Sequence, residues 1–235
     1  MNYLFSLLAI LFLITSCNND ANEMYLSGEI KGLRKGTILL QKIEDTSLVA
    51  VDSVTVDGEA IFSFSETIES PEVYVLSLRI KDESLLDKEL PFFAEPGEVN
   101  IITSLKNFNS SAVITGSKNQ AKLSEYKKLK QRYADRNLDL IEQEFKALQS
   151  GNDSLLEVIR KRKQSTVTGK YLATVNFAIN NNDYELAPYL MLNEVFDANV
   201  KYLDTVYKSL TPKIKDSKYG IELESYITER KQAGN

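Results

Sequence analysis

Hydrophobic residues recur with two different periods along this chain, and the change of period divides it in two. Between residues 24 and 116, short apolar stretches alternate with turn-forming residues, which is the pattern of β-strands. After Ser117, apolar residues recur at every third or fourth position, which predicts α-helices. We therefore predict an α+β protein, with an antiparallel β-sandwich or open barrel over residues 24–116 and an α-helical region over residues 117–235.

The β-rich part contains about seven or eight short strands by this criterion. Residues 48–56 are rich in valine, and Asp57-Gly58 after them predicts a tight hairpin turn, because such turns need positive φ angles. Pro91 predicts an edge or a strand start, since proline cannot donate to a ladder. On the strand that follows Gly58, alternate residues are expected to face the core: Ala60, Phe62 and Phe64.

The first helix is predicted to begin at Ser117, which stands three residues before Gln120 in the arrangement of a capping box. Apolar residues follow at helical spacing: Leu123, Tyr126, Leu129, Tyr133, Ile141, Phe145 and Leu148. We interpret Tyr126 and Tyr133 as packing residues. We expect Phe145 and Phe177 to contact another helix or the sheet.

Turn-forming residues predict where the helices end. Gly151-Asn152-Asp153 ends the first helix and starts the second, and Asn180-Asn181-Asn182-Asp183 ends the second. Two more helices are expected before Thr211-Pro212, and a last helix runs beyond it through Tyr219.

A nearly unbroken apolar stretch runs from Leu4 to Ile14 and leads to Cys17, the sole cysteine. It is shorter than the roughly 20 residues of a membrane-spanning helix and has the length of a secretory signal. Ile14-Thr15-Ser16-Cys17 resembles a bacterial lipobox. We predict a signal peptide over residues 1–16, lipidation at Cys17 and a polar tether over residues 17–23. The alternative is a buried N-terminal helix with a core cysteine.

Lipidation implies a location and a first partner. The lipid on Cys17 would anchor the protein to a membrane of the cell envelope, and we expect the outer membrane, facing the periplasm or the surface. The chain contains no histidine, which excludes a Ser-His-Asp triad and an imidazole metal site. Its net charge of −5 favours no nucleic-acid partner. We expect no cofactor and no enzymatic activity, and predict a non-catalytic interaction or binding module.

Four groups of residues offer candidate chemistry. Acidic residues crowd one loop and could hold calcium, but their spacing is not that of a known calcium loop, so we interpret them as a solvated loop: Asp82, Glu83, Asp87 and Glu89. Arg160-Lys161-Arg162-Lys163 is interpreted as a solvated helix face, with an anionic partner as the alternative. Phe92-Phe93 is assigned to the core rather than to a ligand groove. Asp52-Ser53 lacks a base that could activate the serine.

Several short motifs carry a family resemblance through their order along the chain: Gly28-Glu29-Ile30, Val51-Asp52-Ser53-Val54, Gly58 through Phe62-Ser63-Phe64, Phe92-Phe93-Ala94-Glu95-Pro96-Gly97 and Thr115-Gly116-Ser117-Lys118-Asn119. They resemble the domain of unknown function that lies N-terminal to thioredoxin-like domains in Bacteroidetes lipoproteins. The helical part, with Lys218-Tyr219-Gly220 and the closing residues 229–235, resembles the spacer of the same proteins.

In that family a thioredoxin-like domain with a Cys-x-x-Cys pair usually follows the spacer, whereas this sequence stops at Asn235. Thiol-disulfide exchange needs a thiolate and a resolving cysteine, so the resemblance implies lineage and compartment rather than activity. It also implies an alternative function. The protein would then be an accessory subunit of a thiol-disulfide oxidoreductase system whose thioredoxin-like domain is on another chain.

Overall fold

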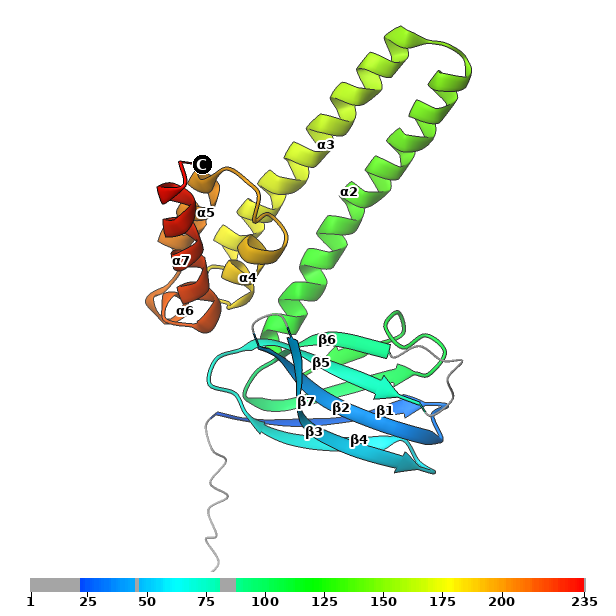
Figure 1. Ribbon diagram of the computed structural model, residues 1–235, viewed down its shortest axis with the longest axis vertical. Helices are drawn as coiled ribbons and strands as arrows, with labels where there is room; N and C mark the ends of the chain where they lie inside the picture. The colour runs from blue at the N-terminus through cyan, green and yellow to red at the C-terminus, as the bar shows by residue number, and fades with distance from the viewer. Residues whose placement is uncertain (1–21, 45–46, 81–87, 235) are drawn as a thin grey trace, which may run out of the picture.

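The computed structural model describes residues 22–44, 47–80 and 88–234 (Figure 1). Two four-stranded β-sheets come first along the chain, and a helical region follows them, which confirms the α+β prediction. Cys17 and the predicted signal peptide lie outside the described residues. Within the described ranges, no helix is both long enough and apolar enough to cross a membrane.

The eight described strands divide equally between the two sheets. Sheet A has the order β4-β1-β7-β8, with bounds β4 Ile61–Thr67, β1 Glu23–Lys31, β7 Gly97–Ser104 and β8 Val113–Thr115. Sheet B has the order β3-β2-β5-β6, with bounds β3 Ser47–Asp57, β2 Lys35–Glu44, β5 Glu72–Arg79 and β6 Lys88–Ala94. All pairs are antiparallel except β1 with β7, which run parallel. Pro91 lies on β6, an edge strand, as predicted.

The predicted hairpin at Asp57-Gly58 is wrong. β3 pairs with β2 and β4 pairs with β1, so the chain crosses from sheet B to sheet A after Asp57. Gly58 does have a positive φ angle, of 125°, but its N–H donates to the carbonyl of Arg34 at 2.8 Å. The turn therefore docks on the connection between β1 and β2, and the strands on its two sides belong to different sheets.

The inner faces of the two sheets enclose the first hydrophobic core. Ala60, Phe62 and Phe64 are buried, as the alternation on β4 predicted. Fully buried side chains come from both sheets: Met24, Leu26, Ile38, Leu40, Leu76 and Phe92. Within sheet A, strands β1 and β7 approach closely at Gly28, where an added Cβ would lie 2.1 Å from the carbonyl oxygen of Ile101.

Two long helices, α2 (Lys118–Gln149) and α3 (Asp153–Asn180), form an antiparallel hairpin that projects from the sandwich (Figure 1). Four shorter helices pack beside its base: α4 Leu186–Asn193, α5 Val200–Ser209, α6 Pro212–Lys215 and α7 Lys218–Gln232. The predicted starts are confirmed. The Ser117 hydroxyl accepts the Gln120 N–H at 3.0 Å, and the Asn152 side chain accepts the Leu155 N–H at 3.0 Å.

A second core lies among the bases of these helices, where the rings of Tyr126 and Phe177 are 5.5 Å apart. The contact predicted for Phe177 is therefore confirmed, but the one predicted for Phe145 is wrong, because that side chain is 61% exposed. Far from the sandwich, α2 packs on α3 through other positions, including Leu140 and Ala147. Phe145 faces away from them into solvent.

Candidate functional site

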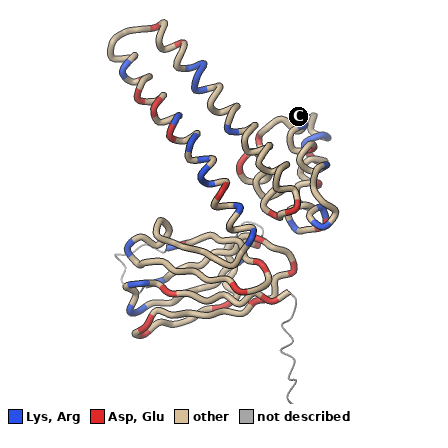
Figure 2. The backbone as a smooth tube through the Cα atoms, turned by 180° about the vertical axis from the view of Figure 1, so that it is seen from behind, with Lys and Arg blue, Asp and Glu red and all other residues tan. Residues whose placement is uncertain are grey.

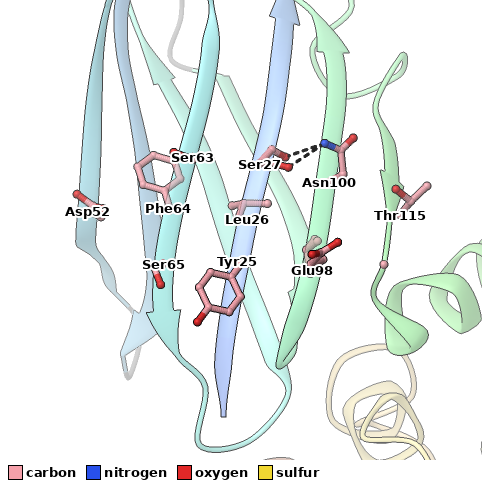
Figure 3. A pocket seen from close by; sticks show the side chains of 12 residues that line it. Tyr25, Leu26, Ser27, Asp52, Ser63, Phe64, Ser65, Glu98, Asn100 and Thr115 are labelled. Atoms are coloured by element: carbon pink, nitrogen blue, oxygen red, sulfur yellow. Dashed lines mark hydrogen bonds between the residues drawn. The ribbon is translucent and has the colours of Figure 1, made fainter. Parts of the chain in front are cut away.

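A shallow groove of about 900 Å³ crosses the outer face of sheet A (Figure 3). Strands β8, β7, β1 and β4 all contribute to it, and Asp52 of β3 lies at one margin. Successive residues of a strand point to opposite faces, so the inward residues of these strands fill the core and the outward ones line the groove. The outward residues are mostly polar: Tyr25, Ser27, Ser63, Ser65, Glu98, Asn100 and Thr115.

The strand register arranges these side chains in two rows that run across the strands. One row contains Ser65, Tyr25 and Glu98. The other row contains Ser63, Ser27, Asn100 and Thr115. Neighbouring strands lie about 4.8 Å apart, so each row presents a polar group at about that interval. An extended ligand that crossed the strands would meet hydrogen-bonding groups along its whole length.

Hydrogen bonds hold several of these side chains in place. The Asn100 amide donates to the Ser27 hydroxyl at 3.0 Å and to the Ser27 carbonyl at 3.4 Å (Figure 3). The Tyr25 hydroxyl donates to one carboxylate oxygen of Glu23 at 3.0 Å, and the Ser65 hydroxyl donates to the other. The groove is thus ordered before a ligand arrives, which reduces the entropy lost on binding.

The charged side chains of the groove are acidic. Glu98 and Asp52 line it, Glu23 borders it, and no described lysine or arginine is among the lining residues. This field repels polyanions. The uncharged hydroxyl and amide groups between the carboxylates both donate and accept hydrogen bonds.

A second concavity, of about 740 Å³, lies between sheet B and helices α4 and α7. Its charged groups pair with one another, since the Lys42 ammonium lies 2.7 Å from Glu44 and the Lys218 ammonium contacts Glu72. The pKa of Glu222 is raised, mainly because the carboxyl group is buried. The positive charge of Lys218 opposes this shift, and the negative charge of Glu72 adds to it. Ion pairing across the cleft links β5 to α7.

Aromatic side chains join the two halves beneath this cleft. Phe93 of β6 contacts the rings of Tyr189 and Tyr219 at centroid distances of 5.3 and 6.3 Å, and these two tyrosines are 5.2 Å apart. The Tyr219 hydroxyl accepts the N–H of Val73 at 3.0 Å, and burial raises the pKa of Tyr219. The cleft therefore borders a packed interface between sheet B and helices α4 and α7, which we call the joint.

A buried polar network completes the joint. Glu95 accepts hydrogen bonds from the first backbone N–H groups of α2, including that of Asn119 at 3.1 Å, where a helix N-terminus favours negative charge. The Asn119 side-chain amide donates to Glu95 at 3.0 Å and to Glu185 at 2.8 Å, and its oxygen accepts the Leu186 N–H at 2.9 Å. Gln120 does not close the predicted capping box, because its side chain accepts the Phe93 N–H instead.

Residues 24–123 match the family described as Domain of unknown function (DUF4369). The match covers the sandwich and the first residues of α2, so both the groove and the Glu95–Asn119 contact lie within it. It agrees with the domain to which the sequence motifs were compared. No curated protein and no solved structure matches this chain.

The structure describes only some of the candidate site residues that were identified in the sequence. Cys17, Asp82, Glu83 and Asp87 lie outside the described residues, and Glu89 lies on β6. Among the described residues, no group of three or more acidic, cysteine or histidine side chains is arranged to hold a metal ion.

Two further interpretations agree with the structure. Lys161 pairs with Glu157 on the surface of α3, and Lys163 pairs with Glu144 of α2, so the basic run is a solvated, ion-paired face. Phe92 and Phe93 are both fully buried, as predicted, but they point to opposite sides of β6. Phe92 enters the sandwich core and Phe93 enters the helical core.

The sequence patterns did not identify the residues of the groove as a site. Asp52 was considered only together with Ser53, whose backbone N–H donates to the Asp52 carboxylate at 2.6 Å. The available signal was the alternation of buried and exposed positions on β1 and β4, most of whose outward residues are polar. That pattern gives each strand a polar side, but it does not say which strands lie next to one another.

Proposed function

We propose that this protein is a non-catalytic module of the cell envelope that binds a ligand through the groove on sheet A. The observation that carries the proposal is the pair of cross-strand rows of hydroxyl, amide and carboxylate groups on an ordered, solvent-facing sheet. These rows come from strands whose other side is mostly apolar and buried, so the fold supports a polar surface without using it for packing.

The chemistry of the rows favours an uncharged, hydroxyl-rich chain such as an envelope glycan. Serine hydroxyls and the Asn100 amide complement sugar hydroxyls, which also donate and accept. Tyr25, which is 38% exposed, offers an apolar ring beside a polar group. Glu98 and Asp52 disfavour a polyanion.

The binding test compares variants on the same sheet. Calorimetry with neutral N-acetylglucosamine oligomers is expected to show binding to the wild type, and about tenfold weaker binding to Ser27→Ala/Asn100→Ala, which removes two or more hydrogen bonds. Thr67→Ala, on the outer side of β4 but outside the groove, is the matched control and should bind normally. Equal binding by all three proteins, or a preference for heparin, contradicts the proposal.

The anchor is proposed from the apolar leader and Cys17. Wild type and Cys17→Ser are expressed in a bacterial host and fractionated. We expect the wild type in the membrane fraction without residues 1–16, and Cys17→Ser released from it. If both proteins stay in the cytoplasm, or if the wild type keeps residues 1–16, the anchor is wrong.

A second candidate function rests on the DUF4369 match over residues 24–123, the domain that the sequence motifs resemble in thioredoxin-like lipoproteins. In this case the chain would position a thioredoxin-like partner rather than exchange disulfides itself. Purified protein should then fail to reduce insulin with dithiothreitol, and should accelerate or localise a separate thioredoxin-like chain that carries Cys-x-x-Cys. Turnover by the protein alone contradicts both candidates.

A further inference from the structure

The distal half of α2 carries a row of large apolar side chains in solvent. Leu138, Ile141, Phe145 and Leu148 are 66%, 45%, 61% and 57% exposed. The hairpin is already packed without them, through a small cluster between the helices: Leu140 and Ala147 of α2 with Leu156 and Ile159 of α3. The exposed row, which we call the α2 seam, therefore has no function in holding the hairpin together.

The spacing of the α2 seam is that of a coiled coil. With Ala134, which is also exposed, the apolar positions follow one another at intervals of four, three, four and three residues. This is the a/d repeat through which one helix meets another, with an apolar residue every 3.5 positions on average. An amphipathic helix that lay along this row would complete a three-helix bundle with α2 and α3.

The charge beside the α2 seam selects the partner. Figure 2 shows basic residues on the part of α2 near the sandwich and acidic residues farther out, where the seam lies. Asp135 and Glu142 occupy the flanking e positions, where Glu142 also pairs with Lys146 of the next turn. On the other side, the g positions hold Asn137 and Glu144, and Glu144 already pairs with Lys163 of α3. The acidic e side favours a partner with lysine or arginine at the facing positions.

The same flanks disfavour pairing between two copies of this chain. In an antiparallel pair the e positions face each other, so Asp135 would meet Glu142 of the second copy. In a parallel pair, each g residue faces the e residue five positions further along the second copy, so Asn137 would meet Glu142 and Glu144 would meet Gln149, and no attractive ion pair would form. Like charges placed together at an interface oppose association.

We infer that the α2 seam is a docking surface for an amphipathic helix of a partner protein, with apolar residues at heptad spacing and basic residues beside them. This is helix-to-helix recognition by apolar anchors, with charge setting the choice of partner. The surface is separate from the groove on sheet A, so either assignment can fail without the other.

The test uses two designed peptides of about three heptads, both with leucine at a and d. One has lysine at e and g, and the other has glutamate there. Fluorescence anisotropy with the full protein is expected to show binding of the lysine peptide, and about tenfold weaker binding of the glutamate peptide.

Phe145→Glu separates seam docking from simple charge attraction. The substitution adds an acidic group, so a purely electrostatic attraction to the lysine peptide would strengthen, whereas seam docking should weaken about tenfold. Because Phe145 is exposed, the variant keeps its fold, which circular dichroism checks. Val158→Glu, at an apolar side chain of α3 that is 44% exposed, is the matched control and should bind like the wild type.

Four results overturn the inference. The lysine peptide could bind Phe145→Glu as tightly as the wild type, or not bind the wild type at all. The wild type could form a dimer that Phe145→Glu converts to a monomer, which makes a second copy the occupant. Finally, neutral lipid vesicles could retain the Cys17→Ser protein and release Cys17→Ser/Phe145→Glu, which makes a membrane the occupant.

Discussion

The two sheets of the sandwich differ in what lies against their outer faces. On sheet A the outward residues of β1 and β4 are mostly polar and stay in solvent, while every second residue is buried. On sheet B the outward residues Val73 and Phe93 enter the helical core, and β5 is buried on both sides from Val73 to Leu78. Strands that are apolar on both sides mark a covered face, and strict alternation marks an open one.

The joint on sheet B should carry the larger share of stability. Phe93→Ala is expected to lower the free energy of unfolding by about 3–5 kcal/mol, because it empties a fully buried aromatic site. Ile61→Ala on the outer face of sheet A, where the side chain is 64% exposed, should change it by about 0.5 kcal/mol or less. Urea unfolding measures both, and equal costs would mean that the helices do not pack tightly on sheet B.

Removing the buried side-chain amide of Asn119 in the joint should have the next largest effect on the free energy of unfolding. Asn119→Ala removes the donor shared by Glu95 and Glu185, and we expect a loss of about 2–3 kcal/mol, since bonds to charged groups are the stronger ones. Asn100→Ala is the matched change in the groove, and it should cost about 0.5 kcal/mol or less. A cost for Asn119→Ala as small as that for Asn100→Ala would contradict the network.

Alkaline pH should weaken the helical core. Burial raises the pKa of Tyr126 to about 12, and the hydrogen bond with Thr174 lowers it only in part. Because tyrosine in an unfolded chain titrates near pH 10, the folded state keeps this proton longer. Its contribution is complete below about pH 10 and decreases by about 2 kcal/mol toward pH 12. Unfolding titrations should show a shallower slope above pH 10 in Tyr126→Phe, and an unchanged slope would contradict the assignment.

The smallest effect on stability is expected in the groove. Ser63→Ala should change the free energy of unfolding by about 0.5 kcal/mol or less, because the side chain faces solvent, while glycan binding falls several-fold. Thermal unfolding and calorimetry on the same sample separate the two effects. A large loss of stability would mean that the rows serve the fold rather than a ligand.

Local features of this chain could be predicted from the sequence. The change of period at Ser117 located the boundary between sheets and helices, and Ser117 and Asn152 are both N-caps. Residues with strong short-range preferences decided these positions. Gly58 was misread, because a positive φ angle is compatible with a hairpin and with a crossing between sheets.

Long-range features could not be predicted in the same way. Phe145 and Tyr126 share one helical pattern, but only Tyr126 lies where other elements surround α2, so the period alone cannot tell packed from exposed. Asn119 bonds to residues 24 and 66 positions away, and no local pattern announces such contacts. The groove depends on the parallel pairing of β1 with β7, which joins segments distant in sequence.

Native-state hydrogen exchange of the Val73 amide tests most directly whether the helices and sheet B form one packed unit. This N–H lies in the joint and donates to the Tyr219 hydroxyl of α7 at 3.0 Å. If the two halves unfold together, Val73 and the amides of α7 should exchange with the same free energy as the central amides of β1, and Tyr219→Phe should lower all three. The α7 amides could instead exchange at a clearly lower free energy than those of β1, and Tyr219→Phe could leave the exchange of the β1 amides unchanged. In that case the two halves open separately and the account of the joint is wrong.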